Sequence, residues 1–329
     1  MNFGVIGCAH GHINKFITQM LDLGWRFNGI YDDGTISAAK ISEKYNVPVF
    51  SNVEELFKQQ ISVVGTSAIN NKKIDIIEIC AAHNVHVIAD KPIVIDDDQY
   101  NRLENVIKDD QIQVGLMLPI RFKPAVHTLK KLIDENVIGR LLNIEIISPH
   151  KLKISSRPDW HFDKAQNGGI IIDLLIHSID LFNWLTESKI CDYTGLMVKS
   201  ILKDKPSFYD LSQFMVHSCS GVNGYLRVDW HTPEKHWSPM DLRLFCTGSN
   251  GLIEVRATGD PVTREQQIIL YGNNNDTTNI EIENPAENMI SDFINRIEGR
   301  NSIISHTDIL NATRMSIVFD KKAKLMNFT

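Results

Sequence analysis

The pattern of apolar positions along the chain changes near residue 120. Before that point, short runs rich in Val and Ile alternate with segments whose apolar residues recur at helical spacing. Parallel strands need helical crossovers between them, so this alternation predicts a doubly wound parallel sheet of the Rossmann type. The predicted strands are residues 2–7, 26–33, 47–50, 61–67, 85–90 and 112–118.

After residue 140, strand-like runs follow one another with Gly, Asn or Pro turns between them. Consecutive strands joined by short turns predict a large, mostly antiparallel open sheet, which helices are expected to cover on one face. We therefore predict an α/β domain over 1–119 and an α+β domain over 120–329. The predicted strands are 140–150, 193–202, 211–220, 223–232, 240–249, 251–257, 265–272 and 277–283, and the predicted helices are 121–139, 169–185, 285–299 and 306–326.

The turn after the first strand is a candidate dinucleotide-binding turn, although its glycine pattern is irregular. Gly7 takes the first position of the G-x-G-x-x-G/A fingerprint. Ala9 and His12 take the second and third positions, and Gly11 lies one place early. Ala9 would allow a slightly less close approach to a diphosphate, and His12 would crowd the helix against the strand. The turn alone is a weak signal.

The second strand adds support, because it ends in Asp32 and Asp33. Asp32 lies near the place in the chain where the acid that binds an adenosine ribose is expected. A carboxylate there accepts hydrogen bonds from the ribose hydroxyls and repels a 2′-phosphate, which favours NAD over NADP. The alternative is an Asp-Asp-Gly turn without a ligand.

Composition and charge limit the class of protein. The 329 residues are 43% hydrophobic and 22% charged, as in ordinary globular proteins. The net charge of −6 argues against nucleic acid or an anionic membrane as the main partner, because both need a concentrated basic patch. The lysine pairs at 72–73, 130–131 and 321–322 are expected on solvated helix faces. No run of about 18 apolar residues is found, so we expect no membrane-spanning helix.

The cysteines favour a reducing compartment. They are odd in number, far apart and mostly inside apolar runs, so we expect reduced, buried thiols and no disulfide framework or zinc site. His10 and His12 lie beside one of them, but a place in a phosphate-binding turn argues against a metal. An apolar strand close to Met1 leaves no room for a signal peptide, and we expect a cytoplasmic protein. The five cysteines are Cys8, Cys80, Cys191, Cys219 and Cys246.

Two further segments carry candidate catalytic groups. Lys91 follows the fifth strand and precedes Pro92, which stiffens the exit from the sheet; a solvated loop lysine is the alternative. In residues 168–180, Asp173, His177 and Asp180 would share one face of an otherwise apolar helix. Buried polar groups need partners or a wet cavity, so this face is a candidate active-site wall. A histidine satisfied by a neighbouring carboxylate in the core is the alternative.

These residues resemble the glucose-fructose oxidoreductase, inositol dehydrogenase and MocA (Gfo/Idh/MocA) family of NAD(P)-dependent enzymes. The segment "VIADKPI" is similar to the Glu-Lys-Pro segment of that family, with Asp90 in place of Glu, and "GGIIIDLLIHSID" resembles its Gly-Gly-x-x-x-Asp-x-x-x-His-x-x-Asp helix. The resemblance places Lys91, Asp173 and His177 on the catalytic positions. The family carries Pro-Asn and a His after its fourth strand, where this chain has Ser67, Ala68 and Asn71. This loop is therefore expected to hold the nicotinamide side of the cofactor differently.

The resemblance implies hydride transfer between nicotinamide and a secondary alcohol or ketone of a sugar, sugar acid or cyclitol. His177 would act as general acid and base, Asp173 would fix its tautomer, and Lys91 would stabilise alkoxide character. The expected cofactor contacts are Gly7, Ala9, His10, Gly11, His12, Asp32, Asp33, Thr66, Ser67, Asn71, Asp90 and Lys91. The expected substrate contacts are Arg121, Arg157, Trp160, His161 and Asp180.

Two other functions are compatible with the sequence. A glycoside-cleaving enzyme of similar fold would oxidise its substrate only transiently and produce no net NADH. A non-catalytic nucleotide-dependent regulator would have no need of the lysine and the histidine. We also expect a homodimer or homotetramer joined through the second domain, because the uncovered face of its sheet needs a cover.

Overall fold

The computed structural model describes residues 1–33, 36–272 and 276–327, and it divides the chain into two compact units. The first unit contains Met1–Leu118, Ala165–Gly168 and Glu287–Arg314, and the second contains the segments between them and the end of the chain. The boundary at 118/119 lies next to the one expected at 119/120. Two later segments also belong to the first unit. Gly34 of the alternative Asp-Asp-Gly turn lies outside the described residues.

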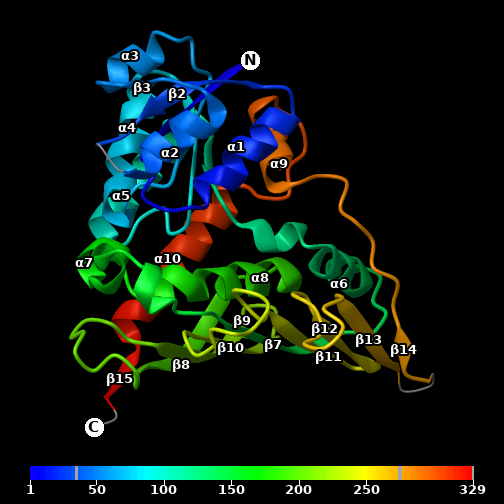
Figure 1. Cartoon of the computed structure of the whole chain (residues 1–329). Helices are drawn as coiled ribbons and strands as arrows, with labels where there is room; N and C mark the ends of the chain where they lie inside the picture. Colours follow the sequence, from blue (N-terminus) through cyan, green and yellow to red (C-terminus); the bar gives the residue numbers. More distant parts are fainter. Residues whose placement is uncertain (34–35, 273–275, 328–329) are drawn as a thin grey trace. The chain divides into compact units, whose positions relative to one another are not determined.

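The first unit is built on a six-stranded parallel sheet in the order β3-β2-β1-β4-β5-β6, which confirms the predicted sheet. Figure 1 labels β2 and β3 of this sheet. Strands β1, β4, β5 and β6 are mostly buried, as expected where helices cover both faces. The six strands are β1 (Asn2–Ile6), β2 (Arg26–Tyr31), β3 (Val49–Phe50), β4 (Val63–Thr66), β5 (His86–Ala89) and β6 (Val114–Leu116).

The longer helices of this unit bury an apolar side. In α1, Ile13, Phe16, Ile17 and Met20 are buried at spacings of three and four, so they form one face. Helix α5 begins after Asp96, whose carboxylate accepts a hydrogen bond from the Gln99 amide. The helices are α1 (Ile13–Asp22), α2 (Ile36–Tyr45), α3 (Val53–Phe57), η1 (Asn70–Lys72), α4 (Lys73–Ala82), α5 (Asp97–Lys108) and α9 (Met289–Ile297).

The second unit is built on a nine-stranded sheet in the order β14-β13-β12-β11-β7-β10-β9-β8-β15. The eight predicted strands are confirmed, and most neighbours are antiparallel. Two pairs, β7 with β10 and β8 with β15, are parallel. The strands are β7 (Leu141–Pro149), β8 (Ile190–Lys199), β9 (Leu211–Ser218), β10 (Asn223–Asp229), β11 (Arg243–Gly248), β12 (Gly251–Arg256), β13 (Gln267–Gly272), β14 (Thr278–Asn279) and β15 (Lys324–Asn327).

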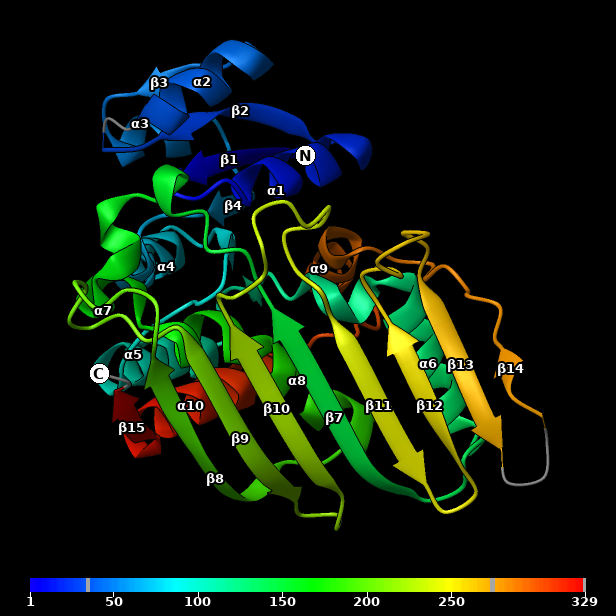
Figure 2. The same cartoon turned by 60° about the horizontal axis from the view of Figure 1, so that its bottom comes forward.

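Helices cover one face of this sheet (Figure 2). In β9, Phe214 and Val216 are buried while Met215 and His217 are exposed, the alternation of a sheet with one covered face. The helical segments of this unit are η2 (Pro119–Phe122), α6 (Pro124–Asp134), η3 (Ile154–Ser156), η4 (Asp159–Phe162), η5 (Ile171–Leu175) and α8 (Ile176–Thr186). A short helix, α7 (Lys164–Asn167), begins at the last residue of one segment of this unit and continues in the first unit.

The carboxy-terminal segment corrects one prediction. A helix was expected over 306–326, but α10 (His306–Lys322) ends earlier, and Lys324–Asn327 form β15 at the edge of the nine-stranded sheet. The lysine pair that closes α10 resembles the end of a helix in sequence. The last four described residues are a strand because they pair with the free edge of β8. The local sequence gives no sign of a partner so far away in the chain.

The segment Lys164–Thr186 is long and apolar enough to cross a membrane by length and composition. Of the most apolar window within this segment, 83% is buried inside the protein, as in the core helix of a folded domain. This burial makes the segment weak evidence for a membrane span. No other helix within the described ranges meets the same criteria.

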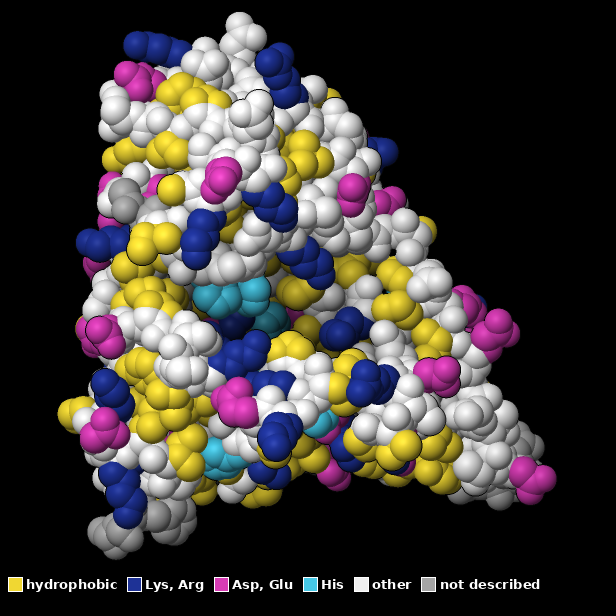
Figure 3. Space-filling model, viewed as in Figure 1, with side chains coloured by type: hydrophobic (Ala, Val, Ile, Leu, Met, Phe, Trp, Pro, Cys, Tyr) yellow, Lys and Arg dark blue, Asp and Glu magenta, His cyan; other side chains and the backbone are white. Residues whose placement is uncertain are grey.

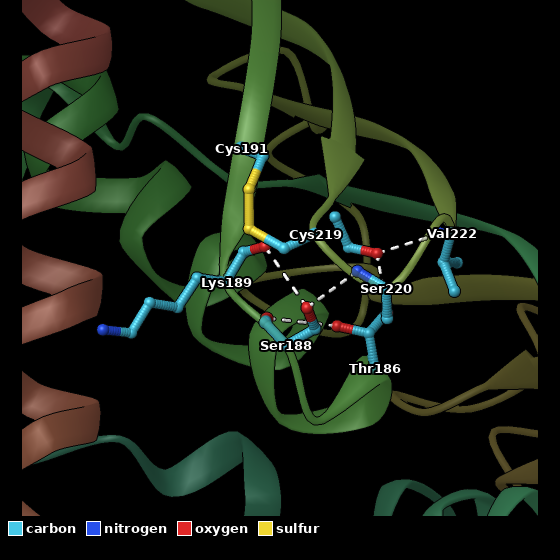
Figure 4. Close-up of a disulfide and its surroundings, with 8 residues drawn as sticks. Thr186, Ser188, Lys189, Cys191, Cys219, Ser220 and Val222 are labelled. Carbon is cyan, nitrogen blue, oxygen red and sulfur yellow. Dashed lines mark hydrogen bonds between the residues drawn. A yellow bond between two sulfur atoms is a disulfide. The ribbon is translucent and has the colours of Figure 1, made fainter.

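The prediction for the cysteines is wrong for one pair. Cys191 at the start of β8 and Cys219 after β9 are exposed and form a disulfide, with their Cα atoms 5.3 Å apart (Figure 4). Cys8, Cys80 and Cys246 are free and buried as expected, and burial raises the pKa of Cys8 and Cys246 to about 12. Residues 28 apart in sequence are adjacent because β8 and β9 pair. The reduced-thiol argument for a cytoplasmic location therefore does not hold for this pair.

The lysine pairs are only partly solvated. Lys72, Lys131 and both members of the last pair are exposed as expected, whereas Lys73 and Lys130 are buried. Lys130 lies beside Asp134 and 2.8 Å from Glu187. Burial of a lysine requires partners for its ammonium, and both lysines have them.

Candidate functional site

Gly7 follows β1 and has a positive φ, a backbone conformation that favours glycine. Its φ is +81°, and a Cβ at this position would lie 2.5 Å from the Cβ of Ala68. The amide of Gly7 donates to the carbonyl of Tyr31, and its carbonyl accepts from the Ser67 amide. The turn after β1 is therefore tied to the ends of both neighbouring strands.

The two aspartates after β2 have different environments. Asp32 is half-buried, and its carboxylate accepts a hydrogen bond from the Cys8 amide at 2.6 Å. Asp33 is exposed and accepts from the hydroxyl of Tyr31 at 3.3 Å. Asp32 is thus held against the turn, where a ribose-binding acid is expected, whereas Asp33 contacts Tyr31.

The loop after β4 carries polar groups at the carboxyl edge of the sheet. Thr66 and Ser67 are fully buried, and no described residue makes a hydrogen bond with the Ser67 hydroxyl. A buried hydroxyl without a partner is costly, so this group suits a polar ligand or an ordered water. Together with the open turn at Gly11, where a Cβ would meet nothing within 4 Å, the residues present fit a dinucleotide.

Asn70 and Asn71 fix a distant segment to this loop. Their side-chain amides donate to the carbonyls of Asn167 and Ala165 at 2.9 and 3.1 Å. Gly168, with φ of 94°, is the last residue of this segment, and Gly169, with φ of 88°, begins the next segment of the second unit. The two glycines before the candidate catalytic helix therefore supply the positive φ values that the chain needs where it passes between units.

Asp90, at the end of β5, is buried beside two histidines. Its two carboxylate oxygens lie 3.1 Å from Nδ1 of His10 and 2.9 Å from Nδ1 of His12. Burial acts to raise the pKa of the Asp90 carboxyl, but the charges of His12 and Lys73 outweigh it, so this pKa lies well below its ordinary value. Figure 3 shows histidine side chains gathered at the surface, with Lys and Arg side chains beside them.

The backbone on both sides of Lys91 is hydrogen-bonded to the buried side chain of Lys73. The Lys73 ammonium donates to the carbonyls of Asp90 and Pro92 at 2.8 and 2.9 Å, and to Oδ1 of Asn70 at 2.9 Å. The Lys91–Pro92 peptide bond is cis. Sequence reasoning missed Lys73, although a signal exists: with Ile77 and Cys80 it takes positions i, i+4 and i+7 of the buried face of α4.

In the second unit, Asp173 and His177 lie on one continuous helical run and are 6% and 8% exposed. The regular helix expected over 169–185 is only partly correct, because Ile171–Leu175 form a π-helical turn and α8 begins at Ile176. Asp173 lies in the π turn and His177 in the first turn of α8. π turns occur often at functional sites, where they alter the direction of side chains.

Arg121 and Asp180, both expected to contact substrate, are joined to each other. The Arg121 guanidinium donates to both oxygens of Asp180, at 3.0 and 2.5 Å, and both side chains are buried. Arg121 also lies over the ring of Trp184, 5.3 Å from its centroid. A substrate contact by either residue stays a prediction, and the contact that the structure provides fixes α8 to the chain before α6.

The segment before the π turn places Arg157 and His161 around Trp230. The Arg157 guanidinium lies 4.9 Å from the Trp230 ring centroid, and Nε of Arg157 donates to the Leu152 carbonyl. The His161 ring meets the Trp230 ring edge-on at 5.3 Å and is buried, whereas Trp160 is half-buried. Burial lowers the pKa of Arg157, and the charge of Asp173 opposes this shift. Arg157 thus lies within electrostatic reach of the candidate catalytic helix.

Family comparisons match most of the chain. Residues 1–116 match the oxidoreductase family with an NAD-binding Rossmann fold, and residues 126–254 match the GFO/IDH/MocA C-terminal domain.

Characterised relatives are distant in sequence. A UDP-N-acetylglucosamine 3-dehydrogenase of Acidithiobacillus ferrooxidans is 22% identical over 61% of this chain and 59% of its own length. A glucose-6-phosphate 3-dehydrogenase of Bacillus subtilis is 23% identical over 60% of this chain and 57% of its own length. The chain thus spans less than two thirds of these two relatives. An inositol 2-dehydrogenase of Ralstonia nicotianae is 26% identical over 77% of this chain and 73% of its own length.

Solved structures share the fold over nearly the full chain. A protein of Erwinia carotovora atroseptica has a TM-score of 0.90 at 23% identity, with 99% of each chain covered. An aldose-aldose oxidoreductase of Caulobacter crescentus has a TM-score of 0.82 at 15% identity, with 98% of this chain and 97% of its own covered. Both family domains, in the expected order and on the expected folds, show that this chain belongs to the Gfo/Idh/MocA family of oxidoreductases.

Proposed function

We propose that this protein is an NAD-dependent dehydrogenase or reductase acting on a secondary alcohol or ketone of a sugar, sugar acid or cyclitol. The observation that carries this proposal is a buried carboxylate and a buried imidazole on one helical run: Asp173 lies in the π turn and His177 in the first turn of α8. The relatives named above act on sugars or inositol according to their names, which supports the same substrate class.

The first unit would hold the cofactor. Gly7 allows the close turn after β1, and Gly11 leaves backbone open there. Asp32 offers a carboxylate for the ribose hydroxyls, and Ser67 offers a buried hydroxyl. The carboxylate of Asp32 would repel a 2′-phosphate, so NAD is the preferred nucleotide. When bound, the nicotinamide accepts or supplies the hydride of the reaction.

The protein's own groups would handle the proton and the charge. His177 would take the hydroxyl proton as the alcohol is oxidised and return it in the reverse direction. Asp173 would fix the imidazole tautomer and stabilise the imidazolium. Lys91 would donate a hydrogen bond to the reacting oxygen and stabilise its alkoxide character. These three roles follow the resemblance of the segments that carry them.

A substrate panel tests this function directly. Purified protein is mixed with sugars, sugar acids and cyclitols and with NAD⁺ or NADP⁺, and the absorbance of reduced nicotinamide is followed. His177→Ala should lower kcat at least about a hundredfold on any active substrate, because general acid-base catalysis contributes about that much. His83→Ala, which changes an exposed histidine at the end of α4, is the matched control. An unchanged kcat in His177→Ala would overturn the role of His177.

We also propose that the protein is a homo-oligomer joined through the uncovered face of the nine-stranded sheet. Met215 is 61% exposed on this face. Apolar exposure of this kind favours association. Sedimentation velocity on the purified chain should give a dimer or tetramer, and Met215→Lys should shift the distribution toward monomer. A monodisperse monomer would rule the proposal out.

A further inference from the structure

Two histidines from the turn after β1 converge on one carboxylate at the end of β5. Nδ1 of His10 and Nδ1 of His12 lie 3.1 and 2.9 Å from the two oxygens of Asp90. The ligand atoms of the three side chains all lie within 4.8 Å of one another. From this arrangement, we propose that His10, His12 and Asp90 bind a divalent first-row transition-metal ion, with Zn²⁺ or Co²⁺ as fitting occupants.

The distances suit such an ion. Zn²⁺ binds imidazole nitrogen and carboxylate oxygen at about 2.0–2.2 Å, so ligand atoms at adjacent corners of its coordination sphere lie about 3 Å apart. Both nitrogen-to-oxygen distances at Asp90 match that separation. The three ligand atoms lie within 4.8 Å of one another, so a cation among them draws the two rings closer together.

One nitrogen of the cluster lacks a hydrogen bond. Nδ1 of His12 bonds with Oδ1 of Asp90, whereas the buried Nδ1 of His10 makes no hydrogen bond with any described residue, although Asp90 is only 3.1 Å away. Two neutral histidines donating to one carboxylate would satisfy both nitrogens. The Nδ1 atom of His10 is misaligned for a hydrogen bond with Asp90. A cation that both Nδ1 atoms face would give it a partner.

The carboxylate is held in place before any ion binds. The Asp90 amide donates to the Thr66 carbonyl at 2.8 Å, and the Asp90 carbonyl accepts from Lys73 at 2.8 Å. The His10 amide donates to the Ser67 carbonyl at 3.0 Å. A site with a fixed carboxylate and a fixed turn loses little conformational freedom on binding, which favours affinity.

The donor set indicates which ions fit. Two imidazoles suit Zn²⁺, Co²⁺, Fe²⁺ and Ni²⁺, whereas Mg²⁺ and Ca²⁺ prefer an all-oxygen set. Asp90 is 2% exposed but His12 is 52% exposed, so solvent reaches one side of the cluster. Water or an anionic group can therefore complete the coordination.

Sequence alone argues against this site, because His10 and His12 lie in a nucleotide-binding turn. The third ligand is 78 residues away from His12, and the parallel pairing of β1, β4 and β5 brings it near. The proposal concerns the protein without nucleotide or substrate, so it stands or falls separately from the dehydrogenase function.

Cobalt binding tests the site. The full chain is treated with a chelator, dialysed and titrated with Co²⁺ in the absence of nucleotide, and the visible ligand-field absorption is recorded. We expect saturation at one ion per chain and displacement by Zn²⁺. His10→Ala, His12→Ala and Asp90→Asn should each weaken binding at least about tenfold. His83→Ala is the matched control, because His83 lies 3.3 Å from the single carboxylate of Glu54 and should leave binding unchanged.

Thermal unfolding gives a second measurement that does not depend on the spectrum. Saturating Zn²⁺ should raise the unfolding temperature of the wild-type protein and of His83→Ala but not of His12→Ala, since only a folded site binds the ion. His12 is half-exposed, so His12→Ala should unfold normally in chelator, which separates lost binding from lost folding. Absence of saturable Co²⁺ binding by the wild-type protein, or equal binding by the wild-type, His10→Ala and His12→Ala proteins, would overturn the proposal.

Discussion

The buried ammonium of Lys73 donates a hydrogen bond to the carbonyl of Asp90 at 2.8 Å. It thereby holds, from the beginning of α4, the backbone that carries Asp90 and Lys91. A lysine is rarely buried unless all its protons find acceptors, and here the carbonyls of Asp90 and Pro92 and the Asn70 side chain accept them.

Lys73→Met should destabilise the first unit by about 2–4 kcal/mol, because it leaves buried acceptors without a donor. Urea unfolding at neutral pH measures this free energy. Lys72→Met, which changes the exposed neighbour, is the control and should change the free energy of unfolding by less than about 0.5 kcal/mol. Equal stability of the two variants would show that the Lys73 hydrogen bonds contribute little.

Gly7→Ala should impair nucleotide binding, whereas Gly11→Ala should have a much smaller effect. A Cβ on Gly7 would lie 2.5 Å from the Cβ of Ala68 at a φ of +81°, while a Cβ on Gly11 would meet nothing within 4 Å. Moving the turn should weaken NADH binding at least about tenfold, which corresponds to about 1.4 kcal/mol. Fluorescence titration with NADH measures both variants. A larger loss in Gly11→Ala would contradict this assignment of the turn.

Asp180→Asn should lower the free energy of unfolding by about 3–5 kcal/mol, because it removes the carboxylate charge that pairs with the buried Arg121 guanidinium. The double variant Arg121→Met with Asp180→Leu should recover a large part of this loss, since neither charge remains. Unfolding in urea of the three proteins measures the effect. If the double variant is less stable than Asp180→Asn, the cost lies in packing rather than in the unpaired charge.

His306 should make stability depend on pH. Burial, followed by the charge of Arg296, lowers its pKa from 6.5 to about 4, and its Nε2 accepts a hydrogen bond from the Val114 amide. Between about pH 4 and 6.5, the His306 imidazole is therefore protonated in the unfolded chain but neutral in the folded chain. The free energy of unfolding consequently falls as the pH falls from about 6.5 toward 4. The full shift corresponds to about 3 kcal/mol, which partial solvent exposure of the side chain reduces to about 1–2 kcal/mol.

His306→Gln keeps an acceptor for the Val114 amide but cannot titrate. The difference in unfolding free energy between pH 7 and pH 5 should therefore be smaller in this variant than in the wild-type protein by about 1 kcal/mol. The comparison between two proteins cancels the contributions of other titrating groups. An identical pH dependence would mean that the His306 proton does not contribute.

Local patterns were sufficient for most of the fold. All six strands of the first sheet and eight of the nine strands of the second follow from apolar runs and turn residues. The ninth strand was predicted as the end of a helix, because Lys324–Asn327 becomes a strand only through pairing with β8. The π turn at Ile171–Leu175 also differs from the regular helix expected, since spacing alone does not distinguish the two kinds of turn.

The candidate site divides in the same way. The glycine turn, Asp32, Lys91 and the spacing of Asp173 and His177 are properties of short segments, so the sequence determined them together with the family. Tertiary structure alone decided that Arg121 pairs with Asp180, that Cys191 bonds to Cys219, and that His10 and His12 face Asp90. The physical reason is distance along the chain: a buried charge, thiol or imidazole takes its partner from whatever strand or helix the fold brings beside it, and no local spacing records that choice.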